Sequence, residues 1–194
     1  MPAYRIVDIS VSNWEPFREY VRLAPPIEEQ GGTWLVRGVP GDVLEGDWRP
    51  ERVSVARFPS AQDVKDYLGS AAYAAARRLR EGAATTRMAV ADGVDPPENS
   101  GGYSIVDVEV TDPDLYRTYV PLVGSSLAAY DGALFVRSEN LEVLEGDWPL
   151  HRLVIIAFPS PARAHEWWAS EEYGEAKAIR QRAARTDLVV VAGV

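Results

Sequence analysis

A small set of polar residues occurs twice in this 194-residue sequence, 99 or 100 positions apart, among residues that are otherwise apolar. The carboxylates among them could act as a base or anchor a ligand, and arginine presents planar donors that match a carboxylate. Together they would suit a site for a small anionic or carbonyl-bearing molecule. The members of the set are Asp8, Arg37, Glu45 and Arg52, and in the second half Asp107, Arg137, Glu145 and Arg152.

Each of these residues also has a structural interpretation. An aspartate at the end of a strand can be paired within the protein, and structural ion-pair networks perturb carboxylates much as active sites do. Arg–Glu and Arg–Asp pairs could hold a hairpin in place or join the two halves. The sequence therefore assigns no residue a catalytic role.

If a cleft functions in only one half, the sequence favours the second, because its aromatic residues give the cleft more apolar lining. Trp167-Trp168 precedes Tyr173, whereas the first half has Tyr67-Leu68 before Tyr73. Aromatic side chains commonly line small-molecule sites, so Trp167 and Tyr173 are further ligand-binding candidates. Packing in the core is the alternative for Tyr173, because it lies in a helical stripe.

Metal and cofactor chemistry finds little support. The sequence has no cysteine and two histidines, His151 and His165, neither of which recurs in the first half. No third ligand stands at metal spacing, and there is no glycine-rich phosphate loop or nucleophile motif. We therefore expect no metal and no cofactor.

The overall charge limits the partners. The formal net charge is −9, without a long block of Lys or Arg. Phosphate contacts need a basic face, so neither a nucleic acid nor an anionic membrane surface is expected as a partner. No signal peptide or membrane-length apolar run is visible, which makes the cytoplasm the expected location.

One pentapeptide reveals the organisation of the chain. Leu-Glu-Gly-Asp-Trp stands at 44–48 and again at 144–148, which indicates an internal duplication of one structural unit. Each copy reads as β-α-β-β-α-β with an extra short strand near the pentapeptide. We expect a first repeat at 1–94, a linker at 95–101 and a second repeat at 102–194.

Local signals add detail to each repeat. Helices are expected to begin at Ser12-Asn13 and Thr111-Asp112-Pro113, where side chains can cap free N–H groups. Pro25-Pro26 and Pro121 should break or kink these helices. A tight turn is expected at Glu139-Asn140 in the second repeat.

The motifs quoted above resemble the family known as domain of unknown function 1330, within the dimeric α/β-barrel superfamily. Both halves share its Tyr-x-Ile-Val-Asp-like opening, Leu-Glu-Gly-Asp-Trp segment, Phe-Pro-Ser corner and Ser-x-x-Tyr helix. The resemblance implies two ferredoxin-like units packed sheet to sheet, here as a pseudo-dimer within one chain. It implies no reaction, and further homo-oligomerisation stays open.

Two functions follow from these observations. Asp8 and Asp107 alternate with the strand positions that should meet the helices, so they are expected to point to the barrel interior or its mouth. The protein could bind a small molecule in each cleft, with or without cofactor-independent catalysis. Alternatively, it is a structural module in which the repeated polar residues only hold the barrel together.

Overall fold

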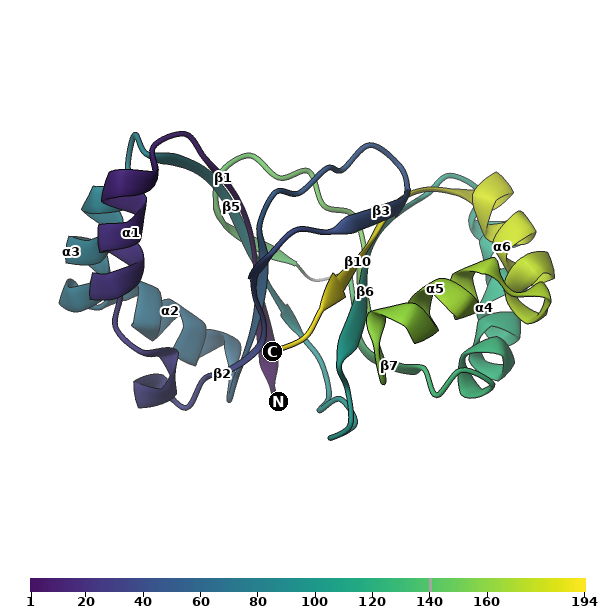
Figure 1. The fold of residues 1–194 in the computed structure, drawn as a ribbon. Coiled ribbons are helices and arrows are strands. Elements are labelled where there is room, and N and C mark those ends of the chain that lie inside the picture. Colours follow the sequence, from purple (N-terminus) through teal and green to yellow (C-terminus); the bar gives the residue numbers. More distant parts are fainter. Residues whose placement is uncertain (140) are drawn as a thin grey trace. The chain divides into compact units, whose positions relative to one another are not determined.

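The computed structural model describes residues 1–139 and 141–194, so the turn expected at Glu139-Asn140 includes a residue outside the described part. The chain is α+β and forms two compact units, each with a five-stranded antiparallel sheet and helices on one face of that sheet (Figure 1). This confirms the expected fold class, with two ferredoxin-like units. Their packing sheet to sheet stays a prediction. No helix within the described residues is long and apolar enough to cross a membrane.

The first unit has the strand order β2-β4-β1-β5-β8. Its first four strands follow the ferredoxin-like order, and the fifth comes from the second repeat. The elements are β1 (Ala3–Val11), α1 (Trp14–Leu23), the 3-10 helix η1 (Ile27–Gln30), β2 (Thr33–Val39), β4 (Val53–Phe58), α2 (Ala61–Gly69), α3 (Ala71–Arg80), β5 (Ala84–Asp92) and β8 (Glu142–Glu145).

The second unit repeats this plan with the order β3-β10-β6-β9-β7. Its fifth strand, β3, comes from the first repeat. The elements are β3 (Asp42–Glu45), β6 (Gly102–Val110), α4 (Pro113–Ala128), β7 (Ala133–Ser138), β9 (Leu153–Phe158), α5 (Pro161–Ala169), α6 (Glu171–Ala183) and β10 (Ala184–Ala192).

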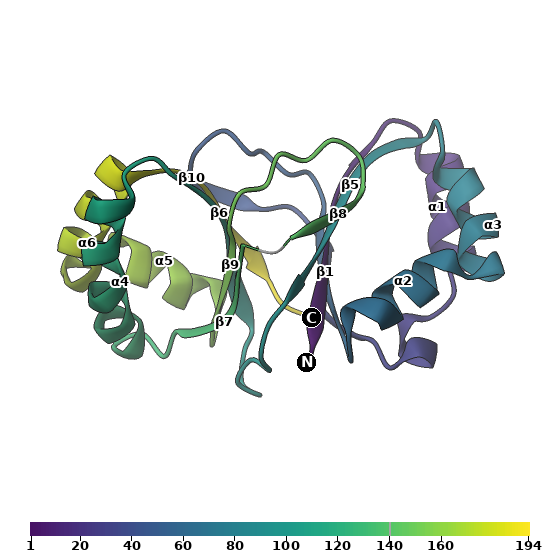
Figure 2. The same ribbon diagram turned by 180° about the vertical axis from the view of Figure 1, so that it is seen from behind.

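The pentapeptide segments are exchanged between the repeats. In the first unit Met88 of β5 pairs with Glu145 of β8, and in the second unit Leu188 of β10 pairs with Glu45 of β3 (Figures 1 and 2). Each sheet is therefore completed by four residues of the other repeat. The sequence predicted the short strand but not the partner to which it binds.

The glycine of the pentapeptide is required by its backbone. Gly46 and Gly146 have φ of 82° and 73°, in the left-handed region that favours glycine. A Cβ on Gly146 would lie 2.4 Å from the carbonyl oxygen of Thr86, and one on Gly46 would lie 2.0 Å from Oδ1 of Asp187. This Asp187 oxygen accepts hydrogen bonds from the backbone N–H groups of Asp47 and Trp48, at 2.6 and 3.0 Å.

The two repeats differ in their first helix. The expected break at Pro25-Pro26 occurs, because α1 ends at Leu23 and the chain continues into η1. The expected interruption at Pro121 is not a break, since α4 runs on through it to Ala128. Pro121 is exposed, so the carbonyl group that loses its helical N–H partner can bond to water instead.

Strand β1 separates its side chains as its alternation predicts. Val7 and Ile9 pack with Phe17 and Met88 in the core between sheet and helices. Asp8 alternates with them and so belongs to the opposite face of the sheet.

Replacing Gly146 by alanine should destabilise the protein by about 2 kcal/mol or more, because the left-handed backbone is strained for alanine and the new Cβ meets the Thr86 carbonyl. Urea unfolding measures the loss. The control is Gly174→Ala near the start of α6, where a Cβ meets nothing within 4 Å. There alanine should stabilise the helix by up to about 1 kcal/mol, and equal effects of the two changes would contradict this account.

Candidate functional site

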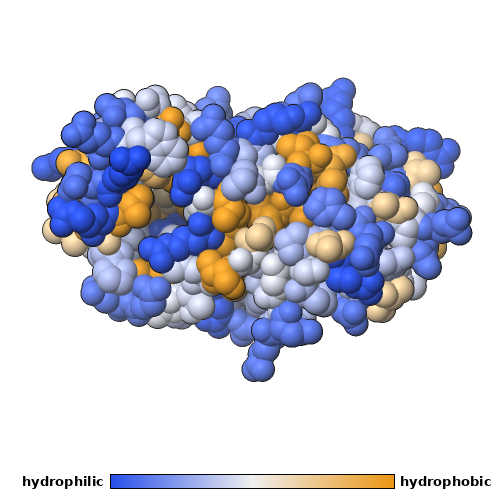
Figure 3. Space-filling view, viewed as in Figure 1, coloured by the Kyte–Doolittle hydropathy of each residue, from blue (hydrophilic) through white to orange (hydrophobic). Residues whose placement is uncertain are grey.

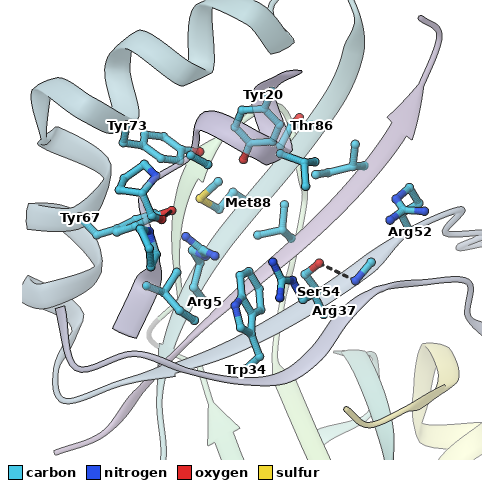
Figure 4. Close-up of a pocket in the computed structure, with 18 of the residues that line it drawn as sticks. Arg5, Tyr20, Trp34, Arg37, Arg52, Ser54, Tyr67, Tyr73, Thr86 and Met88 are labelled. Atoms are coloured by element: carbon cyan, nitrogen blue, oxygen red, sulfur yellow. Dashed lines mark hydrogen bonds between the residues drawn. The ribbon is translucent and has the colours of Figure 1, made fainter. Parts of the chain in front are cut away.

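A cavity of about 590 Å³ lies in the first unit, between the sheet and the helical layer (Figure 4). Small-molecule sites commonly measure about 300–1,000 Å³. Apolar and strongly hydrophilic residues lie side by side around a hollow over this unit (Figure 3). Five aromatic side chains contribute to the lining: Phe17, Tyr20, Trp34, Tyr67 and Tyr73.

The short helix α1 leaves room for this cavity. After Leu23 the chain turns through Pro25-Pro26, and residues 24–28 form part of the cavity wall. The hydroxyl of Tyr67 holds this turn by donating to the carbonyl oxygen of Pro25 at 2.9 Å. In the second unit the longer α4 instead packs Leu127 into the core.

Arg5 is the most unusual residue of the cavity wall. It is 4% exposed, and its Nε is buried without a hydrogen-bond partner. Its guanidinium carbon lies 5.3 Å from the ring centre of Trp34, 5.5 Å from that of Phe58 and 5.1 Å from that of Tyr67. No carboxylate of the described residues forms an ion pair with it.

Two more arginines stand on the same wall. Arg37 projects from β2 and lies 5.3 Å from the ring centre of Trp34, and Arg52 precedes β4. The Arg52 guanidinium lies against the backbone of Gly38, whose N–H donates to Oγ of Ser54 at 2.9 Å. Figure 4 shows Arg5 and Arg37 beside the indole of Trp34, with Arg52 further along the strands.

The equivalent positions of the second unit form a packed core. Ser104 stands where the first repeat has Arg5, and Trp167 stands where it has Tyr67. Trp167 is 1% exposed, stacks on Tyr173 with ring centres 4.0 Å apart, and donates from Nε1 to Oγ of Ser126 at 3.1 Å. Trp167 therefore packs within the core of the second unit.

A buried polar network borders the cavity. Arg80 donates to both carboxylate oxygens of Glu145 at 2.8 and 2.9 Å, and also to the Thr86 hydroxyl. Burial alone would lower the pKa of Arg80, but its hydrogen bond to Glu145 and the neighbouring tyrosines raise it overall. Burial, followed by the neighbouring Tyr73, raises the pKa of Tyr20.

The second unit contains the same network. Arg180 donates to both oxygens of Glu45 at 3.0 and 2.6 Å, to the Thr186 hydroxyl at 2.7 Å, and from Nε to the Tyr173 hydroxyl at 3.0 Å. Here too burial by itself would lower the pKa of Arg180, but the hydrogen bonds to Glu45 and Tyr173 and the charge of Glu45 together raise it. The pair also occurs in the unit where the equivalent positions pack into the core, so the pair itself does not define the site.

The structure separates the residues that the sequence grouped together. Arg37 and Arg52 line the cavity, whereas Asp8 forms an ion pair with Arg87. In the second repeat Asp107 accepts from the backbone N–H and side chain of His151, and Arg152 pairs with Glu139. Their role as ligand contacts stays a prediction, as it does for the remaining candidates: Glu45 and Glu145 in the networks, Arg137 on an exposed part of β7, and Trp167 and Tyr173 in the core.

Sequence reasoning missed Arg5 in the cavity wall and the two arginines of the buried networks. Arg80 and Arg180 recur 100 positions apart, each seven residues after a repeated tyrosine, which places arginine and tyrosine on one helix face. Arg5 could have been noticed because it alternates with Asp8 and shares the helix-facing side of β1 with Val7. No three residues of the kinds that bind metals form a group in the described part of the chain.

The comparison with known families agrees with this description. The model of the family called domain of unknown function 1330 matches residues 2–94 and again 101–194. The chain belongs to this family. It contains two copies of the family's domain, as the duplicated pentapeptide predicted. No curated protein sequence matches the chain significantly.

Solved structures with low sequence identity show the same fold. A candidate chlorite dismutase designated TA0507 covers all of this chain and 94% of its own, with 11% identity and a TM-score of 0.57. A candidate monooxygenase from Lactobacillus acidophilus covers all of the chain and 98% of its own, with 13% identity and a TM-score of 0.54. A heme-binding protein from Thermus thermophilus covers all of the chain and 91% of its own, with 11% identity and a TM-score of 0.50. At such identities the likeness is evidence for the fold alone.

A double-mutant cycle on Arg80 and Glu145 should reveal the coupling across the exchanged segment. Glu145→Leu leaves a buried guanidinium unpaired and should lower the free energy of unfolding by about 3–5 kcal/mol. Adding Arg80→Leu should recover part of this loss, measured by urea unfolding. Arg185→Leu, which removes an arginine that is mostly exposed, should change stability by no more than about 0.5 kcal/mol. Additive losses in the cycle would contradict the assignment.

Alkaline titration should reveal the buried tyrosines. Burial raises the pKa of Tyr20 and Tyr119 above the ordinary 10.0, so the unfolded chain releases these protons first. Their contribution to stability is present below pH 10 and is lost as the pH rises through the folded-state pKa. Ultraviolet absorbance should therefore show fewer than nine tyrosinates until circular dichroism reports unfolding. Ionisation of all nine in the folded protein near pH 10 would contradict the burial.

Proposed function

We propose that the first unit binds one small organic acid with an apolar, partly aromatic body, and that Arg5 holds its acid group. The cavity is lined by aromatic rings and by Met88, Val7 and Ile9, which suit such a body. The second unit, whose equivalent positions are filled, serves as the scaffold. We therefore expect one ligand per chain.

The observation that carries this proposal is the unpaired Arg5. Burying a cation without a counter-charge is unfavourable by several kcal/mol, even after the surroundings relax. Ring contacts return only about 0.5–2 kcal/mol each. A ligand carboxylate would supply the missing charge and accept two parallel hydrogen bonds from the guanidinium group.

The rest of the lining supports an anion over a cation. The acidic residue of the wall is Glu28, which is exposed on η1. Against it stand the guanidinium groups of Arg5, Arg37 and Arg52, together with Arg22, which is already paired with Glu19 at 2.7 Å. An anion entering this cavity therefore meets an excess of positive charge.

Heme is not part of this proposal, although one structure with the same fold is described as heme-binding. Neither histidine lines the cavity: His151 interacts with Asp107, and His165 lies near the Pro161 carbonyl group and Asp42 in the second unit. The wall therefore provides no imidazole as an axial ligand. In the alternative function, a structural module, Arg5 would only pack against the rings of Trp34, Phe58 and Tyr67.

Binding of 2-naphthoate, measured by calorimetry, tests the proposal. The wild-type chain should bind one molecule and prefer it to the neutral 2-naphthamide, because only the acid pairs with Arg5. Arg5→Met should weaken binding of the acid by about 10- to 100-fold. Arg185→Met, which removes the same charge from a mostly exposed position, should leave binding unchanged.

The stability of Arg5→Met separates the two functions. If Arg5 serves a ligand, the variant loses an uncompensated buried charge and should unfold at the same or a higher urea concentration than the wild type. If Arg5 is structural, the variant should be less stable by about the value of its ring contacts, roughly 1–3 kcal/mol. Equal binding of acid and amide, or a destabilised variant that still binds the acid, would overturn the proposal.

A further inference from the structure

We infer that the ligand carries a second carboxylate, bound by Arg37 and Arg52 at the outer end of the cavity. This inference rests on the proposed function of Arg5. It assigns a second anion subsite to residues that the first carboxylate does not use, and so narrows the ligand to a dicarboxylate with an apolar, ring-like body.

The first observation is that Arg37 and Arg52 have no acidic partner. Both line the cavity, and within the described residues neither forms an ion pair or a side-chain hydrogen bond. Arg37 is exposed and Arg52 half-buried, so together they stand where the cavity meets solvent. Arg37 stands beside the Trp34 ring at 5.3 Å, and Arg52 stands beside the Trp14 ring at 5.5 Å. This end of the cavity thus presents two cations to which no acid of the described residues is already bound.

The second observation is that the equivalent arginine of the second unit is paired with an acidic residue. Arg152, the counterpart of Arg52, forms an ion pair with Glu139. The first repeat has Val39 at the position of Glu139. In the second unit, where the core is filled, Glu139 neutralises the arginine. In the first unit, beside the cavity, no glutamate stands at this position.

The third observation concerns the distance between the two subsites. The guanidinium carbons of Arg5 and Arg37 each lie 5.3 Å from the centre of the Trp34 ring, so they are at most twice that distance apart. A flat apolar body lying on the Trp34 indole could carry one acid group to each. The second repeat has Leu134 instead of Trp34 and lacks this platform.

The probes are 2-naphthoate and 2,6-naphthalenedicarboxylate, which share one ring system and differ by one carboxylate. The wild-type chain should bind the dicarboxylate about tenfold or more tightly than the monocarboxylate, since a charge-assisted pair adds at least that factor. Calorimetry gives both dissociation constants. The body of the ligand contributes equally to both and therefore cancels in their ratio.

The repeats supply matched variants. Val39→Glu places next to Arg52 the acid that the second unit has, and should abolish the preference for the dicarboxylate while leaving 2-naphthoate binding within about twofold. Arg37→Met should do the same by removing one of the two donors. The controls are Glu139→Val and Arg137→Met, the same positions in the second unit, which should leave both constants unchanged.

The outcomes distinguish this inference from the function on which it rests. The inference is supported if the preference for the dicarboxylate is lost in both Val39→Glu and Arg37→Met and is kept in both control variants. Equal binding of the two acids by the wild type, with the Arg5 dependence intact, overturns the second subsite but leaves the proposed function standing. Binding of neither acid overturns both. Thermal unfolding of each variant confirms that it is folded, and a preference kept in a folded Arg37→Met also overturns the inference.

Discussion

The buried guanidinium–carboxylate pairs, Arg80 with Glu145 and Arg180 with Glu45, are the interactions on which the rest of the structure depends. Each joins the last turn of a helix in one repeat to the pentapeptide of the other. Such pairs contribute modestly to net stability, because desolvation offsets their attraction, but a wrong partner would leave a buried charge unpaired. They therefore fix a strand that carries a glutamate at the edge of each sheet, and each sheet takes this fifth strand from the other repeat.

This exchange explains why the two repeats can differ so much at the cavity. The networks that hold the exchanged strands are the same in both units, so the fold is maintained independently of what lines each helix–sheet space. The second repeat can then fill its space with a stacked Trp167 and Tyr173 and a continuous α4. The first keeps a helix broken at Pro25-Pro26 and a charged wall. The differences concentrate around one cavity: Arg5 against Ser104, Trp34 against Leu134, Val39 against Glu139 and Tyr67 against Trp167.

Much of the fold could be predicted because its signals are local. Strand alternation placed Val7 and Ile9 towards the helices, and the capping residues marked where α1 and α4 begin. The exchange could not be predicted, because the pattern of the pentapeptide is the same whether it pairs within its own repeat or with the other. The aromatic Trp167 suggested an open cleft, but a large ring can also fill one. That choice depends on residues distant in the sequence, such as Ser126, whose hydroxyl accepts a hydrogen bond from the Trp167 indole at 3.1 Å.

The net negative charge of the protein and the positive charge of its cavity wall affect an approaching anion over different distances. With a net charge of −9, the surface repels polyanions, but at physiological ionic strength this field decays within about 8 Å. Inside the cavity the nearest charges are the guanidinium groups of Arg5, Arg37 and Arg52, and water screens them least at Arg5, the most buried of the three. A small acid at the opening of the cavity would therefore meet these guanidinium groups at short range, where the net negative charge of the surface is largely screened. The proposed ligand thus depends on the local charge of the cavity wall and not on the net charge of the chain.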